Sequence, residues 1–149
     1  MIIPAALHIP PEVLRHLGEF LRKGTTVVIE SGAGFAGHLN FRQHRRVLRE
    51  YMQIDVRAPV DLWSQDSGSW RAPYVDYAWP YRAKVRDFSR VVPLGDQPGE
   101  IIAWADDLPV ALKRRIGKGT LIYLGSPLGP ALWAGDTEAR QWLSRLFSL

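Results

Sequence analysis

The feature that most constrains the fold is a helical pattern that runs directly into an apolar strand near the start of the chain. Pro10, Pro11 and Glu12 open the pattern, because proline suits a first helical turn and an acid stabilises the positive end of the helix dipole. Lys23 and Gly24 close it with a basic last turn and a C-terminal glycine. Residues 25–29 are all β-branched, which predicts a strand buried on both faces of a parallel sheet. A helix followed by such a strand is typical of α/β proteins.

Length and composition favour one domain, residues 1–149, with a sizeable core. The chain has 149 residues, 46% of them hydrophobic, and a net charge of +4. Because there is no cysteine, disulfides, thiolate metal sites and a cysteine nucleophile are excluded. Its apolar runs are far shorter than the roughly 20 residues that cross a bilayer, and its first residues lack a secretory signal pattern. We therefore expect a cytoplasmic protein without membrane association.

Two further local patterns are clear. Gly117 and Lys118 predict a tight turn that joins strands at 110–116 and 120–124 into an antiparallel hairpin. Asp136, with Glu138 behind it, predicts the N-cap of a final helix. A helix is also expected at 41–52, with arginines along one side, which either form a solvated face or bind an anion or an acidic partner: Arg42, Arg45, Arg46 and Arg49.

The candidate functional site follows the strand at 25–29. In open α/β sheets ligands bind outside the carboxyl ends of strands, and a glycine-rich turn begins there. The ligand-binding candidates are Glu30, Ser31, Gly32, Gly34, Phe35 and His38. Ser31 is also a candidate nucleophile with His38 as its base. However, Ile29 and Ala33 replace the glycines of a nucleophile elbow, so the preferred interpretation is a turn whose backbone amides bind an anion or bind nothing.

Metal and cofactor motifs are missing. The histidines (His8, His16, His38 and His44) show no metal-ligand spacing, so no metal site is predicted. Gly117 and Lys118 join strands instead of opening a helix, so they are not a phosphate loop, and no cofactor is expected.

Aromatic residues crowd between the two apolar strands. Their rings either stack on a sugar or base, with Arg71 or Arg82 adding contacts, or cover a sheet edge or build a subunit interface. The residues are Trp63, Trp70, Tyr74, Tyr77, Trp79 and Tyr81.

The order of these elements resembles the class I glutamine amidotransferase-like superfamily. The resemblance is carried by Ile2-Ile3-Pro4, by the helix that ends at Gly24, by residues 25–32 and by the hairpin at 109–125. It is closer to the non-amidotransferase branch, which includes trehalose-utilisation-like proteins and β-galactosidase trimerisation domains. It implies an α/β, flavodoxin-like three-layer sandwich with a mainly parallel central sheet, an added antiparallel hairpin and a shortened N-terminus.

The departures from that superfamily shape the functional prediction. Because the chain has neither a cysteine elbow nor a His-x-Glu pair, glutaminase activity is not expected. The sequence favours a protein that is not an enzyme, because no complete catalytic triad is visible. We expect a non-catalytic domain that serves in assembly or ligand binding. A shortened N-terminus leaves a sheet edge or apolar face uncovered, which favours a homodimer or larger homo-oligomer. The alternatives are a small-molecule or carbohydrate-binding protein, for a sugar or an anionic ligand, and a serine hydrolase that uses Ser31; nucleic-acid binding is not expected.

Overall fold

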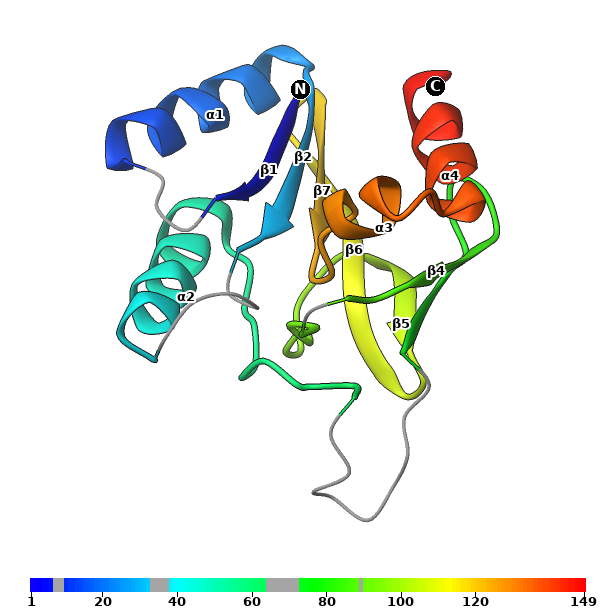
Figure 1. The fold of residues 1–149 in the computed structure, drawn as a ribbon. Helices are drawn as coiled ribbons and strands as arrows, with labels where there is room; N and C mark the ends of the chain where they lie inside the picture. Colours follow the sequence, from blue (N-terminus) through cyan, green and yellow to red (C-terminus); the bar gives the residue numbers. More distant parts are fainter. Residues whose placement is uncertain (7–9, 33–37, 64–72, 89) are drawn as a thin grey trace.

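The fold is a seven-stranded mixed sheet flanked by four helices in the part of the chain that the structure describes (Figure 1). The structure is a computed structural model, and it describes residues 1–6, 10–32, 38–63, 73–88 and 90–149. The strand order is β1-β2-β7-β6-β5-β3-β4, so β1 and β4 are the two edge strands. The elements are β1 (Ile2–Ala6), α1 (Pro11–Lys23), β2 (Thr26–Ser31), α2 (His38–Met52), β3 (Tyr74–Tyr77), β4 (Ala83–Arg86), β5 (Glu100–Ala105), β6 (Leu108–Ile116), β7 (Gly119–Leu124), α3 (Gly129–Trp133) and α4 (Thr137–Phe147).

Antiparallel pairing dominates the sheet. Only β1, β2 and β7 run parallel, whereas β7, β6, β5, β3 and β4 pair antiparallel in succession. Two tight turns cause this: residues 106 and 107 link β5 to β6, and residues 117 and 118 link β6 to β7. Such short connections can join only antiparallel strands, because a parallel pair needs a crossover of a dozen or more residues. Both turns use positive φ angles, +52° at Asp106 and +61° at Gly117, as hairpin turns of this kind require.

The expected α/β flavodoxin-like three-layer sandwich with a mainly parallel sheet is therefore wrong. The sheet is strongly curled into a half-barrel, and the irregular register of β5 between Ile101 and Trp104 adds to the local twist. The antiparallel hairpin was predicted correctly, but it belongs to an antiparallel run that reaches from β7 to the β4 edge instead of being an addition to a parallel sheet.

Two hydrophobic clusters lie on opposite faces of the sheet. Alternate residues of β2 divide between them: Val27 and Ile29 join one cluster, and Val28 joins the other. The first cluster is covered by α1, which packs on β2 and β7, and α1 also contacts α2. The second is covered by α4, which packs on β4 and on α3 (Figure 1).

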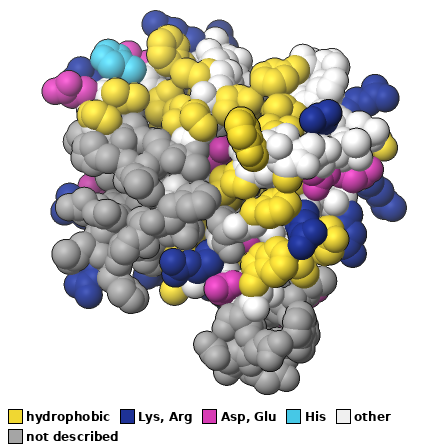
Figure 2. Space-filling model, viewed as in Figure 1, with side chains coloured by type: hydrophobic (Ala, Val, Ile, Leu, Met, Phe, Trp, Pro, Cys, Tyr) yellow, Lys and Arg dark blue, Asp and Glu magenta, His cyan; other side chains and the backbone are white. Residues whose placement is uncertain are grey.

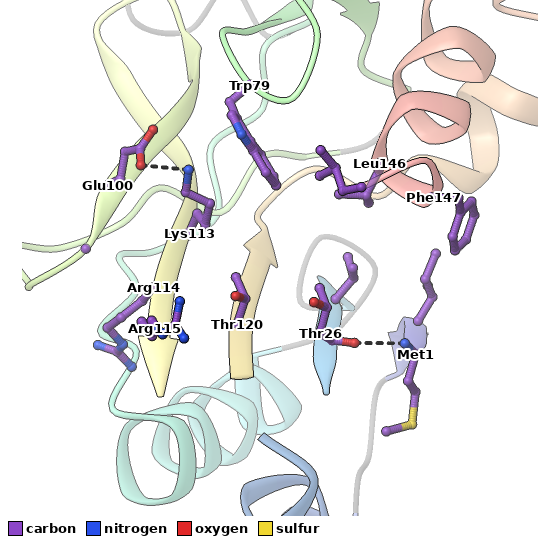
Figure 3. Close-up of a pocket in the computed structure, with 14 residues that line it drawn as sticks. Met1, Thr26, Trp79, Glu100, Lys113, Arg114, Arg115, Thr120, Leu146 and Phe147 are labelled. Atoms are coloured by element: carbon purple, nitrogen blue, oxygen red, sulfur yellow. Dashed lines mark hydrogen bonds and ion pairs between the residues drawn. The ribbon is translucent and has the colours of Figure 1, made fainter. Parts of the chain in front are cut away.

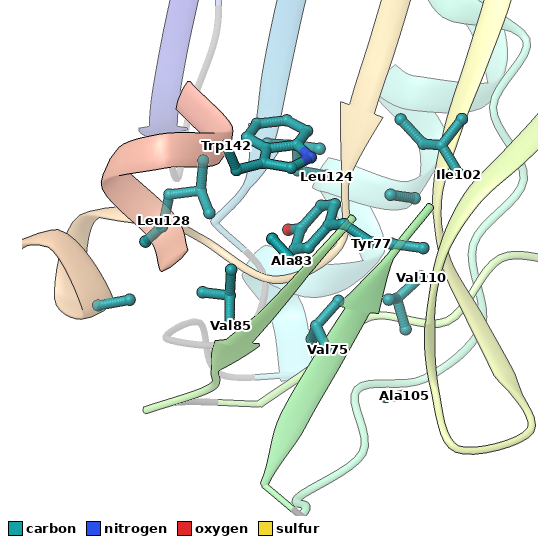
Figure 4. Close-up of a cluster of buried hydrophobic side chains, with 14 of the residues drawn as sticks. Val75, Tyr77, Ala83, Val85, Ile102, Ala105, Val110, Leu124, Leu128 and Trp142 are labelled. Atoms are coloured by element: carbon teal, nitrogen blue, oxygen red, sulfur yellow. The ribbon is translucent and has the colours of Figure 1, made fainter. Parts of the chain in front are cut away.

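The second cluster is built around Trp142 of α4, whose side chain is fully buried (Figure 4). The Trp142 ring packs on Tyr77 of β3 with 4.6 Å between centroids, and its Nε1 donates a hydrogen bond of 2.9 Å to the carbonyl of Trp79. These contacts join the last helix to the curled end of the sheet. Through Trp142, α4 therefore packs against the curled sheet. Tyr77 is a core residue and is not available to stack on a sugar, which was one interpretation of the sequence.

Local helix signals are confirmed. α1 begins with Pro11 and ends at Gly24, which takes the left-handed conformation, φ +112°. Asp136 caps α4 by accepting hydrogen bonds from the amides of Glu138 and Ala139. α2 begins at His38, three residues before the expected start at 41.

Candidate functional site

Two of the sequence candidates, Glu30 and Ser31, end strand β2 and are buried. Glu30 is 7% exposed, and its Oε1 accepts a hydrogen bond of 3.0 Å from the backbone amide of Leu128. Leu128 directly precedes α3, so the Glu30 carboxylate ties the end of β2 to the start of that helix. This contact gives Glu30 a clear structural task at the carboxyl edge of the sheet.

Asp87 supplies a second buried carboxylate. Asp87 is 1% exposed, and its Oδ1 accepts a hydrogen bond of 2.7 Å from the hydroxyl of Ser126. Burial raises the pKa of the Tyr77 phenol far above its usual value, and the Glu30 and Asp87 carboxylates raise it further. Asp87 and Ser126 were not predicted from the sequence, because no short motif contains them and only the fold brings them together.

Ser31 lies on the opposite face of β2 from Glu30, as the alternation of a strand requires. It is fully buried beside Tyr123. Burial raises the pKa of the Tyr123 phenol, and the neighbouring Ser31 side chain opposes that rise. A hydroxyl enclosed in this way is not presented to a substrate in solution.

The remaining candidates are only partly described. Gly32 follows β2 and is buried. Gly34 and Phe35 lie outside the described residues, as do Trp70 and Arg71. His38 begins α2, and its side chain lies outside the described part, so its distance from Ser31 is not fixed. The ligand-binding set therefore stays a prediction.

A groove of about 780 Å³ lies at the opposite end of these strands, where β1, β2 and β7 begin (Figure 3). Its floor includes Ile2 and Val28, and its far wall is formed by Leu146 and Phe147 from the end of α4. The nearer wall is formed by Trp79 and the start of β5. No sequence motif marks this groove, because its lining residues come from the ends of several strands and from α4, which are far apart in the chain.

Three basic residues of β6 line the groove and differ in what they bind. Lys113 pairs with Glu100 at 2.8 Å and lies over the Trp79 ring, 4.3 Å from its centroid. Arg114 instead donates hydrogen bonds to the carbonyls of Met52 and Gln53 at the end of α2. Arg115 is exposed, and among the described residues it makes no ion pair.

A second exposed feature stands beside the edge strand β4. The guanidinium of Arg86 lies between two aromatic rings, 4.9 Å from the Trp63 centroid and 5.3 Å from that of Phe88. We call Trp63, Arg86 and Phe88 the arginine stack. The indole of Trp63 is fixed by a hydrogen bond of 3.1 Å to the carbonyl of Asp87. Figure 2 shows that exposed hydrophobic and basic side chains are interleaved on this face.

The arginines of α2 are largely engaged with acids. Arg45 and Arg49 both pair with Asp55, and Arg46 pairs with Glu50 one turn away. The hydrogen bond from Arg49 lowers the pKa of the Asp55 carboxyl, and the positive charges of Arg49 and Arg45 add to this effect, while desolvation opposes it. The arrangement favours a solvated, ion-paired face.

Within the described ranges, no group of three or more histidines and acids could hold a metal ion. No helix there is long and apolar enough to span a bilayer.

Comparisons with known proteins reveal similarity in structure alone. No protein-family model matches the chain, and no curated protein matches its sequence. The fold is similar to part of a GH42 β-galactosidase from G. stearothermophilus, with a TM-score of 0.64 and 20% identity over 99% of this chain. It is also similar to part of an exo-β-1,4-mannosidase from Opitutaceae bacterium strain TAV5, with a TM-score of 0.64 and 11% identity over 96% of this chain. A cytoplasmic protein from Salmonella typhimurium LT2 matches with a TM-score of 0.62 and 12% identity over 95% of this chain and 62% of its own.

The chain spans only 21% of that β-galactosidase and 24% of that mannosidase. The fold is therefore one that also occurs as a minor part of larger glycosidase chains. This agrees with the β-galactosidase side of the resemblance drawn from the sequence. The description as a glutamine amidotransferase-like, flavodoxin-like protein is wrong, since the sheet is a curled half-barrel similar to parts of glycosidases.

Proposed function

We propose that this chain is a non-catalytic assembly domain, and that it joins copies of itself through the arginine stack beside β4. The observation that carries the proposal is the fixed, exposed arrangement of Trp63, Arg86 and Phe88. Tryptophan and arginine are enriched among the residues that dominate binding energy at protein interfaces. Because the stack is already ordered, little conformational entropy is lost when a partner covers it.

Two further observations support the proposal. β4 is an edge strand whose outer side has no neighbouring strand in the described structure, and proteins commonly cover such edges. Arg86 also links this edge to the corner between α3 and α4, because its amide donates to Asp136 Oδ2 at 3.2 Å. That corner carries Trp133, whose side chain is 94% exposed.

The structural neighbours are consistent with such a role, since a domain-sized part of a glycosidase need not contain the catalytic groups. A homodimer or larger homo-oligomer is part of the proposal. So is a cytoplasmic location, which the name of the Salmonella neighbour supports. The hydrolase alternative is not adopted, because the Ser31 hydroxyl is fully buried. Carbohydrate binding is not adopted either, because Lys113 covers the Trp79 ring at the groove.

The test is the mass of the protein in solution, measured by sedimentation velocity over a range of concentrations. We expect an oligomer whose dissociation constant rises about 30-fold in Phe88→Ala or Trp63→Ala, as for interface residues that contribute about 2 kcal/mol. Phe20→Ala is the matched control, because Phe20 on α1 is 46% exposed and Phe88 is 42% exposed. A wild-type monomer at every concentration, or equal effects of Phe88→Ala and Phe20→Ala, would overturn the proposal.

A further inference from the structure

The floor of the groove is organised in two rows that cross the sheet. At its outer end Arg115 of β6 is paired with Thr120 of β7, and Thr120 is paired with Thr26 of β2. Paired residues on neighbouring strands project from the same face, so one guanidinium and two hydroxyls form a continuous polar row. Figure 3 shows Arg115, Thr120 and Thr26 side by side along this end of the groove.

The inner row is two residues further along the strands and is mostly apolar. Lys113 is paired with Ile122, Ile122 with Val28, and Val28 with Ile2 of β1. The side chains of Leu146 and Phe147 stand over the same end of the groove (Figure 3). The groove therefore offers an apolar bed with hydrogen-bonding groups at one end.

The basic side chains of β6 that line the groove differ in how available their charges are to a ligand. Lys113 is neutralised by Glu100 and rests on Trp79, so its charge is already balanced. Arg115 is exposed and has no ion-pair partner among the described residues. One available guanidinium beside two hydroxyls suits a single carboxylate, which accepts paired hydrogen bonds from arginine.

We propose that this groove binds a small amphipathic carboxylate, a molecule with an acyl or aromatic body and one acid group. The carboxylate binds Arg115, Thr120 and Thr26, and the apolar body lies on Ile2 and Val28 under Phe147. The volume of about 780 Å³ is in the range of small-molecule sites. A nucleotide or a sugar suits the groove less well, because each would place many polar groups on an apolar bed.

This site goes beyond the proposed assembly role and shares no residue with the arginine stack. The probes are decanoate, decanol and the fluorescent anion anilinonaphthalene sulfonate (ANS). We expect ANS to bind saturably at one site per chain and to be displaced by decanoate. Arg115→Gln should weaken decanoate binding about tenfold or more, while decanol, which has no charge, should bind equally to both proteins.

Two controls separate the site from general effects. Arg57→Gln removes an exposed arginine outside the groove and should leave decanoate binding unchanged. Phe147→Ala, at a side chain 67% exposed, should weaken both decanoate and decanol without harming the fold. Circular dichroism of each variant verifies folding. Unsaturable ANS binding, no displacement by decanoate, or equal decanoate affinity in Arg115→Gln and wild type would each overturn the proposal. The mass of the protein is measured on the same samples. Ligand binding then tests the groove, and the mass tests the assembly role, so the two proposals can fail independently.

Discussion

Among single residues, Asp87 shows how the fold accommodates a carboxylate in its interior. Its side chain is 1% exposed and accepts a hydrogen bond from Ser126, which itself is 5% exposed. A buried acid that loses a hydrogen-bond donor keeps the cost of desolvation, so the contribution of the donor is large relative to its size.

We predict that Ser126→Ala lowers the free energy of unfolding by about 1–3 kcal/mol, because it removes a donor to a buried charged group. Urea unfolding measures the loss. Ser148→Ala is the control, since the Ser148 hydroxyl is on the exposed last turn and donates to the carbonyl of Ser144. Its effect should stay within about 0.5 kcal/mol. Equal effects of the two substitutions would show that the bond to Asp87 does not stabilise the fold.

At this scale the sequence indicates where strand residues are buried but does not reveal their partners. The burial of residues 27–29 and the position of Glu30 at the end of a strand follow from local pattern. Strand alternation also predicts that Glu30 and Ser31 face opposite sides of the sheet, although both were candidates for one ligand site. The partners of Glu30, at Leu128, and of Asp87, at Ser126, lie 98 and 39 residues away, so no local signal could reveal them.

Between elements, Gly119 determines how closely α1 approaches the sheet. A Cβ atom at Gly119 would lie 2.3 Å from the carbonyl oxygen of Leu21 and 2.5 Å from that of Thr25. Both contacts are backbone atoms at the junction of α1 and β2, so no side chain can rotate away. The first residue of β7 must therefore be glycine, because there is no room for a Cβ atom at this position.

We predict that Gly119→Ala destabilises the protein by about 1–3 kcal/mol or more, since the helix and strand must move apart. Gly129→Ala is the comparison, because a Cβ atom there meets nothing within 4 Å. That change should be neutral or stabilising by up to about 1 kcal/mol. Thermal unfolding of both variants decides the matter, and a milder effect at Gly119 than at Gly129 would contradict the structural reason.

Elements with local signals were predicted well, and their arrangement was not. Proline and glycine mark the ends of α1, Asp136 marks the start of α4, and Gly117 marks the β6–β7 turn. Strand order has no such signal, because β5 pairs with β3 across more than twenty residues of chain. Two apolar strands, β2 and β7, look like the centre of a parallel sheet in sequence, and antiparallel strands extend the sheet beyond them.

In the molecule as a whole, the two hydrophobic clusters share the same strands. In β7, Leu121 and Tyr123 belong to the cluster under α1, while Ile122 and Leu124 belong to the cluster under α4. Neither cluster can lose its packing while the strand between them stays ordered.

We therefore predict a single cooperative unfolding transition. Far-ultraviolet circular dichroism follows the whole backbone, and tryptophan fluorescence includes the buried Trp142 in one cluster. The two urea curves should coincide. Separate midpoints would indicate that the clusters unfold independently and that the shared strands do not couple them.

The double burial of β2 and β7 has a last consequence, which concerns slippage of one strand along another. When one face of a strand is exposed to solvent, a shift in register by one residue moves the apolar side chains from the buried face to the exposed face, and the free-energy cost opposes the shift. In β2 the residues from Val27 to Ile29 are apolar in either position, so that penalty is weak. Alignment must instead be held at the two ends of the strands: by the close approach of Gly119 to the backbone of Leu21, and by the reach of Glu30 to the amide of Leu128. These two contacts prevent β2 and β7 from shifting along each other, and they thereby fix the register of the two strands.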